Sequence, residues 1–219
     1  MLPMNSTKKI VEEFNLKADL FKDYSMAVMN LLANLLKKEK YKHHISHRIK
    51  EISSLKEKIT RKKNIGKIYK SINDIEDIVG IRIVFYTEAD RKKFIKSLSR
   101  AIGDGLLRIE QASKISGYRS THAIIGFGTD RTHLDEYKRF KGLKCEIQMT
   151  LILDNAWAEV EHDIFYKEGS SLHGLNREKY TTLKKRMEIV MHDYIRKAST
   201  GLENIVRNVK RLEIENKMN

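Results

Sequence analysis

The sequence predicts an α+β fold in which helices flank a mixed central β-sheet. Apolar residues at helical spacing surround a centre that is rich in β-branched residues and contains one crossover helix. A single proline and eleven glycines in 219 residues leave room for long helices. With 41% hydrophobic and 33% charged residues, the chain can build a sizeable core, which excludes a mostly disordered protein.

Helices are expected before and after the centre. Residues 7–36 carry apolar side chains at helical spacing and predict one or two helices. A helix is also predicted in the basic stretch that follows, with its charges on the opposite face. Its apolar positions are Ile45, Ile49, Ile52, Leu55 and Ile59. Beyond the centre, residues 153–164 predict a helix and residues 183–212 a long amphipathic one.

The centre of the chain changes to the period of β-strands. Residues 81–86 are β-branched and aromatic and predict a buried strand, and residues 88–102 predict a helix that ends at Gly103. Further strands are predicted over 106–109, 121–127 and 143–150. We therefore expect N-terminal helices (1–44), a core (45–168) and a long C-terminal helix packed on the core (169–219).

Positive charge is the most distinctive feature of the composition. The chain has a net charge of +14 and a pI near 9.7, and residues 37–70 hold thirteen Lys and Arg against three Glu. This concentration suits a polyanionic partner such as nucleic acid, nucleotide phosphates or an anionic membrane face. It fits a solvated basic helix equally well.

Other features narrow the class of protein. The single cysteine, Cys145, excludes a disulfide framework and a Cys-rich zinc site. No apolar run approaches the ~20 residues that a membrane span needs. The first nine residues, MLPMNSTKK, lack the apolar centre of a signal peptide. We therefore expect a soluble, cytoplasmic protein without a membrane partner.

Acidic residues precede the predicted strand 81–86, and an arginine lies inside it. Asp77 stands at the entrance of the strand, and Gly80 permits a close approach to the backbone. Arg82 interrupts an otherwise apolar run, and a buried guanidinium needs an anionic neighbour. That neighbour can be a protein carboxylate or a bound phosphate, and both alternatives fit the sequence.

Residues 144–150 alternate between apolar and polar side chains. Period two puts the apolar residues on one face and Glu146 with Gln148 on the other. On a central strand, the charge of Glu146 would need a metal ion or a substrate hydroxyl nearby. On an edge strand it would simply face solvent, and both positions fit the sequence.

Residues 116–122 combine a glycine turn with an aromatic ring and a guanidinium. Tyr118 can stack on a base and Arg119 can bind a phosphate, which suits a nucleotide. A turn whose tyrosine closes the edge of the core is an equally good interpretation.

Residues 156–163 lie on the helix predicted after the last strand. Trp157 falls on the apolar face and is assigned to packing. Glu159 and His162 are three residues apart and can orient one another, although one such pair is weak evidence for a di-metal centre. The chain has no HExxH, P-loop, GxSxG or GxGxxG motif.

Taken in order, these segments resemble the synthetase domain of the RelA/SpoT-type alarmone synthetases, which include small and toxic small synthetases. The matching motifs are Asp77-Ile-Val-Gly80-Ile-Arg82, Gly117-Tyr118-Arg119-Ser120-Thr-His122, Glu146-Ile-Gln148 and Trp157-Ala-Glu-Val-Glu161-His162. Upstream, Arg48-Ile-Lys50 with Ser54 and Lys58 is similar to the basic ATP-contacting segment of the family. The resemblance covers residues 45–168 and implies a nucleotidyltransferase-like synthetase domain.

The resemblance also implies a Mg²⁺-dependent pyrophosphokinase. Such enzymes move the β,γ-pyrophosphate of ATP to the ribose 3′-hydroxyl of GDP or GTP and make (p)ppGpp. Asp77 and Glu146 would hold the Mg²⁺, and Glu146 would activate the attacking hydroxyl. The implied catalytic residues are Asp77, Arg82 and Glu146. The implied ATP-binding residues are Arg48, Lys50, Ser54, Lys58 and Arg82. The implied acceptor-binding residues are Lys114, Tyr118, Arg119, His122 and Gln148.

Two departures from the family pattern fall where acceptor phosphates would bind. Met149-Thr150 follows Glu-Ile-Gln where the family commonly has an arginine, and residues 111–116 lack its usual Pro-Lys stretch. A guanine nucleotide is the favoured acceptor. The alternative is a toxin that pyrophosphorylates the 3′-terminal adenosine of tRNA, which the net charge of +14 also suits.

Two further alternatives belong to other classes of protein. A catalytically inactive nucleotide- or RNA-binding module would keep the fold without the reaction. The presence of both Asp77 and Glu146 argues against it, because carboxylates weaken polyanion binding unless a metal lies between them. The second is a purely structural helical interaction protein, suggested by the long helix predicted over 176–214, and the β-rich centre argues against it. The same helix can still form a homo-oligomer or dock an inhibitory partner such as an antitoxin.

Overall fold

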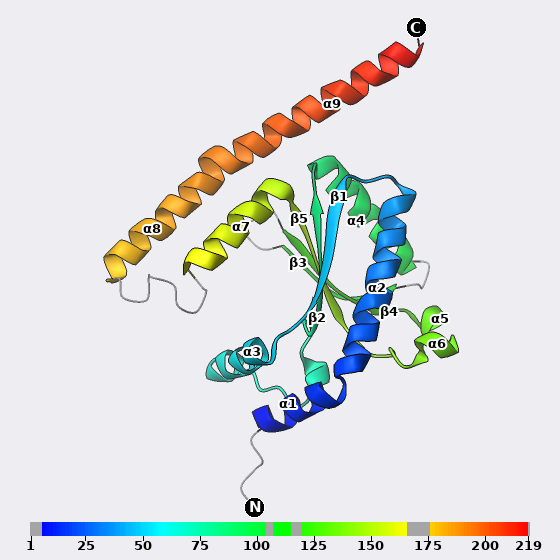
Figure 1. Ribbon diagram of the computed structural model, residues 1–219, viewed down its shortest axis with the longest axis vertical. Helices are drawn as coiled ribbons and strands as arrows, with labels where there is room; N and C mark the ends of the chain where they lie inside the picture. Colours follow the sequence, from blue (N-terminus) through cyan, green and yellow to red (C-terminus); the bar gives the residue numbers. More distant parts are fainter. Residues whose placement is uncertain (1–5, 104–106, 115–119, 166–175, 219) are drawn as a thin grey trace, which may run out of the picture.

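The computed structural model describes residues 6–103, 107–114, 120–165 and 176–218, and it confirms the α+β class (Figure 1). Its strands are β1 (His43–Ile49), β2 (Val79–Phe85), β3 (Leu107–Lys114), β4 (Thr121–Phe127) and β5 (Cys145–Leu151). They form one mixed sheet in the order β1-β2-β5-β4-β3. The β2–β5 pair is parallel and the other neighbouring pairs are antiparallel.

Helices precede, interrupt and follow the strands. They are α1 (Ser6–Leu16), α2 (Ala18–Lys38), α3 (Ile52–Asn64), α4 (Glu88–Gly103), α5 (Thr129–Thr132), α6 (Asp135–Lys138), α7 (Ile152–Phe165), α8 (Arg177–Ile189) and α9 (Arg196–Met218). A 3₁₀ turn, η1 (Ile72–Asp74), leads into β2, and a π-helical segment, η3 (Val190–Ile195), joins α8 to α9. Within the described ranges, no helix combines the length and the apolarity that a membrane crossing needs.

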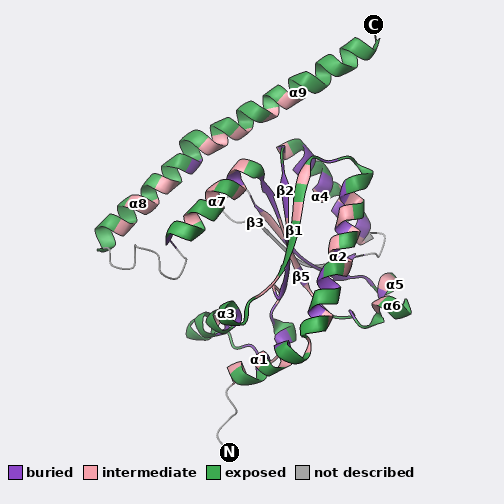
Figure 2. Ribbon diagram, in the orientation of Figure 1, coloured by how far each residue is buried: buried purple, intermediate pink, exposed green. Residues whose placement is uncertain are grey.

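The core lies on the face of the sheet that α2 and α4 cover (Figures 1 and 2). Alternate residues of the central strands point there, and Ile81, Ile83 and Ile147 are at most 1% exposed. From α2, the fully buried ring of Tyr24 meets Phe127 of β4 edge to face, with 5.4 Å between the ring centroids. Because one face is buried in this way, the residues between these positions are directed to the other face.

The helix predicted in the basic stretch, with apolar positions from Ile45 to Ile59, is wrong in its first half. Residues 43–49 form strand β1 at the edge of the sheet, and the helix, α3, begins only at Ile52. The physical reason is that Ile45 and Ile49 are four residues apart, a spacing that puts two side chains on one face of a helix and of a strand alike. Pairing with β2 decides between them.

Strand β3 is longer than predicted. It runs to Lys114, although the apolar pattern ends at Ile109, and its pairing with β4 shifts between Ile109 and Gln111. An edge strand with hydrogen bonds on one side tolerates polar residues, so hydrophobic periodicity does not reveal its second half. Most other elements begin and end within two residues of the prediction, and β4 matches it at both ends.

The C-terminal helices lie along one side of the sheet domain and extend beyond it (Figure 1). The indole of Trp157 on α7 donates to the carbonyl of Met187 on α8 at 2.9 Å, in keeping with its predicted packing role. On α9, a carboxylate oxygen of Glu203 accepts from the backbone N–H of Glu88, the first residue of α4, at 2.8 Å. Much of α9 nevertheless remains exposed (Figure 2).

We expect Tyr24→Phe to destabilise the protein. The hydroxyl of Tyr24 donates to the carbonyl of Leu143 at 3.2 Å and ties α2 to the loop before β5. The substitution leaves a buried carbonyl without this donor, which costs roughly 1–3 kcal/mol. Urea denaturation checks this value. Tyr194→Phe, at a site that is 66% exposed, serves as control, and equal stability of the two variants would contradict the prediction.

Asp74 gives a pH-dependent prediction. Backbone N–H groups of Lys70 and Ser71 donate to its carboxylate at 2.7 and 3.0 Å and hold the pKa of Asp74 below its ordinary value. Ionised Asp74 therefore stabilises the fold above the unfolded pKa of about 4, and this contribution is lost as pH falls through the folded pKa. We expect Asp74→Ala to lower the stability of the fold at pH 7, because the two backbone N–H groups lose their charged acceptor.

The stability difference between Asp74→Ala and the wild type should shrink below pH ~4. Denaturation at pH 7 and pH 3 measures it. Asn73→Ala changes the neighbouring residue of the same turn, which does not titrate. The prediction would be refuted if the stability difference between Asp74→Ala and the wild type did not change with pH, as expected for Asn73→Ala.

Candidate active site

The face of the sheet opposite the core gathers charged and polar side chains from four strands. They are Arg48 on β1, Arg82 on β2, His122 on β4, and Glu146 and Gln148 on β5. Gly80 pairs in register with both Arg48 and Glu146, and Gln148 pairs with both Arg82 and His122. Because paired residues of neighbouring strands point to the same side, strand order alone brings these groups together.

Asp77 lies two residues before β2 and is held by two lysines. The ammonium of Lys58 on α3 is 2.7 Å from Asp77 Oδ1, and that of Lys50 is 3.2 Å from Oδ2. All three side chains are less than 20% exposed. Burial by itself raises the pKa of Asp77, but the hydrogen bonds and charges of Lys58 and Lys50 outweigh it and hold the pKa below its ordinary value. Asp77 is therefore anionic at neutral pH.

Glu146 lies on a central strand, and protein groups hold both of its oxygens. His122 Nδ1 is 3.0 Å from Oε1, and the amide nitrogen of Gln148 donates to Oε2 at 2.9 Å. Burial raises the pKa of Glu146, whereas hydrogen bonds from His122 and Gln148 lower it, and the net effect is a lowered pKa. The carboxylate is thus a preoriented anion on a half-buried surface.

Arg82 has the anionic neighbour that its sequence position requires, and that neighbour is a protein carboxylate. Its guanidinium forms an ion pair with Glu159 of α7. It also donates to the side-chain oxygens of Asn155 and Gln148, each at 3.3 Å. Asn155 and Glu159 are one helical turn apart, so one face of α7 is directed at Arg82.

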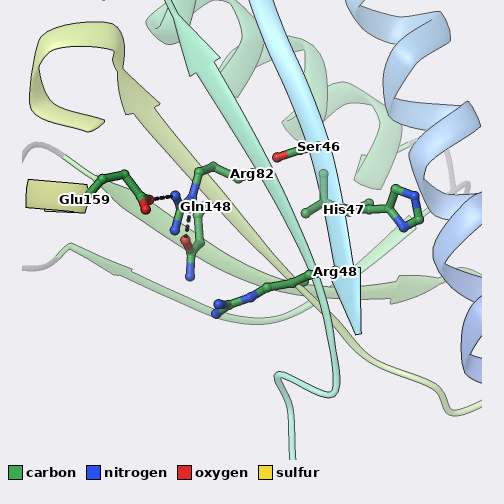
Figure 3. Close-up of a pocket in the computed structure, with 8 residues that line it drawn as sticks. Ser46, His47, Arg48, Arg82, Gln148 and Glu159 are labelled. Carbon is green, nitrogen blue, oxygen red and sulfur yellow. Dashed lines mark hydrogen bonds and ion pairs between the residues drawn. The ribbon is translucent and has the colours of Figure 1, made fainter. Parts of the chain in front are cut away.

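A cavity of about 210 Å³ opens beside these groups (Figure 3). Its walls include Ser46, Arg48, Gly80, Arg82, Gln148 and Glu159. A Cβ at position 80 would lie 3.4 Å from the side chain of Arg48, about van der Waals distance, so Arg48 lies directly over Gly80 of β2. His47 points to the other side of the sheet, where its Nδ1 is 2.8 Å from the hydroxyl of Ser25 on α2.

The remaining predicted site residues lie apart from this cluster or outside the described ranges. Ser54 is exposed on α3. Lys114 ends β3, in register with Thr121, and only its backbone is described. Tyr118 and Arg119 fall in residues 115–119, outside the described residues. The structure therefore brings together the groups expected around Asp77 and Glu146, and only part of the expected acceptor side.

The sequence did not reveal which side chains the predicted site residues contact. It assigned Lys50 and Lys58 to ATP, and it assigned His122 and Gln148 to the acceptor. In the structure the lysines hold Asp77, and His122 and Gln148 hold Glu146. The pairing of Arg82 with α7 was also missed. The four-residue spacing of Asn155 and Glu159 marks one helical face, but it does not say what that face meets.

The two carboxylates suit a magnesium ion that also binds a nucleotide. Among the described residues, no group of three or more His, Cys, Asp or Glu forms a ready-made metal site. Asp77 and Glu146 are nevertheless close enough that the charge of Asp77 raises the pKa of Glu146 against its other partners. Mg²⁺ is commonly held by one or two carboxylates, with water and substrate phosphates completing its octahedral shell. The residues present therefore fit that ion.

Comparisons with known proteins agree on one family. The family model described as "Region found in RelA / SpoT proteins" matches residues 47–171. The GTP pyrophosphokinase YwaC from Bacillus subtilis (strain 168) is 27% identical over 173 residues, which span 75% of this chain and 80% of that protein.

Solved structures share the fold. A GTP pyrophosphokinase family protein from Streptococcus pneumoniae matches with a TM-score of 0.70 and 23% identity, over 91% of this chain and 96% of that one. The small alarmone synthetase 1 from Bacillus subtilis matches with a TM-score of 0.69 and 17% identity, over 91% and 99%. That synthetase has also been solved bound to its product pppGpp and to AMPCPP. Since the family model covers more than half of the chain, this protein belongs to the RelA/SpoT family.

Proposed function

We propose that this protein is an ATP-dependent pyrophosphokinase that transfers the β,γ-pyrophosphate of ATP to the ribose 3′-hydroxyl of GDP or GTP, making (p)ppGpp. One observation carries the proposal: Asp77 and Glu146, both with lowered pKa values and close enough for their charges to interact, lie beside the cations Lys50, Lys58 and Arg82. Transfer of a polyphosphate depends mainly on neutralising and aligning charge, which this arrangement supplies.

Cationic side chains on this face would bind the ATP phosphates. Arg48 and Arg82 border the cavity, and Lys50 and Lys58 are paired with Asp77. Guanidinium groups bind phosphate oxygens in a fork, whereas ammonium groups act as point charges. The two kinds of group together would orient the triphosphate for attack at its β-phosphorus.

Glu146 is the proposed general base. The 3′-oxygen of the acceptor attacks the β-phosphorus of ATP, and its proton goes to the carboxylate of Glu146. The bond between the β-phosphorus and the α,β-bridging oxygen breaks, so AMP leaves and the pyrophosphoryl group is transferred. Each carboxylate oxygen has two lone pairs, so the hydrogen bonds from His122 and Gln148 leave room for this proton.

Asp77 and Glu146 are the groups that would hold Mg²⁺. The bound ion would supply charge neutralisation for the phosphate oxygens of ATP. Lys50 and Lys58 keep Asp77 ionised and positioned, and this is the state in which a carboxylate binds a hard cation.

A tRNA 3′-terminal adenosine is the second candidate acceptor, and one observation favours it. The outer face of α3 presents Lys56, Arg61 and Lys63 to solvent, next to the helix turn whose Lys58 holds Asp77. Exposed cations near a reaction centre would suit a long polyanion. A guanine nucleotide remains the favoured acceptor because the matched relatives are named GTP pyrophosphokinases.

An acceptor assay tests the proposal directly. The protein is incubated with γ-labelled ATP and, separately, with GDP, GTP and deacylated tRNA. We expect label in ppGpp and pppGpp together with release of AMP. Label on tRNA instead would establish the second candidate acceptor, and absence of transfer to all three would overturn the proposed reaction in favour of a binding module.

We expect Asp77→Asn and Glu146→Gln each to lower kcat by at least about 100-fold, because each removes a carboxylate charge proposed to hold the metal ion, and Glu146→Gln also removes the proposed base. Thermal denaturation should show both variants folded. Asp135→Asn and Glu136→Gln make the same changes at exposed positions of α6 and serve as matched controls. Wild-type turnover in either site variant would remove that residue from the mechanism.

Lys58→Met should raise the KM for ATP by roughly tenfold, the effect of losing one charged contact to phosphate. Lys56→Met alters an exposed lysine half a helical turn away and should leave the KM for ATP with a guanine acceptor unchanged. Initial rates at varied ATP separate the two variants. Equal KM values for Lys58→Met and Lys56→Met would exclude the role of Lys58 in ATP binding.

A further inference from the structure

Gln148 lies between the two charged groups that the proposed reaction needs most. Its side-chain oxygen accepts from Arg82 Nε at 3.3 Å, and its side-chain nitrogen donates to Glu146 Oε2 at 2.9 Å. Arg82 borders the cavity proposed for ATP, and Glu146 is the proposed base. One amide therefore contacts both the donor side and the acceptor side of the reaction centre.

The chemistry of the neighbours fixes the orientation of this amide. A guanidinium only donates hydrogen bonds, and an ionised carboxylate only accepts them. The amide oxygen must therefore face Arg82, and the amide nitrogen must face Glu146. Of the side chains of this length, only Gln offers an acceptor and a donor from one rigid plane.

Position 148 is the place on the sheet where such a bridge can form. β5 lies between β2 and β4, and Gln148 pairs in register with Arg82 on one side and His122 on the other. Glu146 precedes it by two residues and so projects from the same face. The result is a continuous row of contacts. The row runs from His122 through Glu146, Gln148 and Arg82 to Glu159.

We propose that Gln148 is a positioning residue, which orients the carboxylate of Glu146 and couples it to the donor-binding Arg82, and that it is not a ligand of the acceptor. This inference rests on the proposed function and deepens it. His122 holds one oxygen of Glu146, and Gln148 holds the other. Without Gln148, the carboxylate can rotate about its contact with His122, and the line of proton transfer from the 3′-hydroxyl is lost.

Two substitutions at position 148 test the role. Gln148→Met keeps the length of the side chain and removes both hydrogen bonds, and we expect kcat to fall roughly 10- to 100-fold, as for a small misplacement of a reacting group. Gln148→Glu keeps an acceptor for Arg82 but sets a second carboxylate against Glu146, so its kcat should be lower still. The KM for the acceptor should stay within about twofold of wild type in both variants.

Asn155→Ala is the matched control. Asn155 is the other amide that accepts from Arg82, also at 3.3 Å, and it comes from α7 instead of β5. The structure records no hydrogen bond between Asn155 and Glu146 among the described residues. Its loss should raise the KM for ATP and should not reproduce the fall in kcat.

A double-mutant cycle with Arg82→Lys measures the coupling. If Gln148 acts between Arg82 and Glu146, the loss in kcat/KM for Arg82→Lys with Gln148→Met should be smaller than the product of the two single losses. Independent roles would give the full product.

Each outcome of these measurements decides the inference. A tenfold rise in acceptor KM with unchanged kcat in Gln148→Met would make Gln148 an acceptor ligand and overturn the proposal. A kcat loss in Asn155→Ala equal to that in Gln148→Met would reduce Gln148 to support of Arg82. A wild-type chain inactive with every acceptor would overturn the proposed function itself, so the two failures are distinguishable.

Discussion

The carboxylate of Glu146 imposes the strongest constraint on this site. It projects from a central strand and is only 17% exposed, so protein donors must offset the loss of its hydration. The donors come from the same strand and from the neighbouring β4, and the strand order decides which residues can reach it. The core on the opposite face fixes that order and so holds the charged face in place.

The sequence predicts those parts of the fold whose pattern of apolar residues fits a strand or a helix, but not both. The run 81–86 is apolar on both faces, apart from Arg82, and no helix of that length would be so β-branched. β1 was not predicted because the four-residue spacing of Ile45 and Ile49 fits both a helix and a strand. The second half of β3 was not predicted because an edge strand needs no apolar residues. In both cases tertiary pairing supplies the missing information.

Only part of the site follows from sequence. Period two puts Glu146 and Gln148 on one face, opposite Cys145 and Ile147, and the structure agrees. The sequence also indicates that Arg82 needs an anionic partner, because its neighbours in the strand are apolar. The sequence does not identify that partner, because the contact between Glu159 and Arg82 depends on how α7 packs against the sheet. Likewise, the contact between His122 and Glu146 requires β4 to lie beside β5, which no local pattern encodes.

The charge balance of the open face connects the composition to the proposed reaction. Arg48, Lys50, Lys58 and Arg82 face three carboxylates, those of Asp77, Glu146 and Glu159, so the cluster itself is nearly neutral. A nucleoside triphosphate brings about four negative charges, which side chains in this ratio do not neutralise, so the divalent cation proposed at Asp77 and Glu146 would complement them. Most of the net charge of +14 must then reside outside the cluster, and the exposed lysines and arginines of α3 hold part of it. The chemistry of the donor and the basic surface of the protein are therefore separate features. Substitutions at the exposed Lys56, Arg61 and Lys63 of α3 can change the second without disturbing the first, whereas Lys58 of the same helix belongs to the cluster.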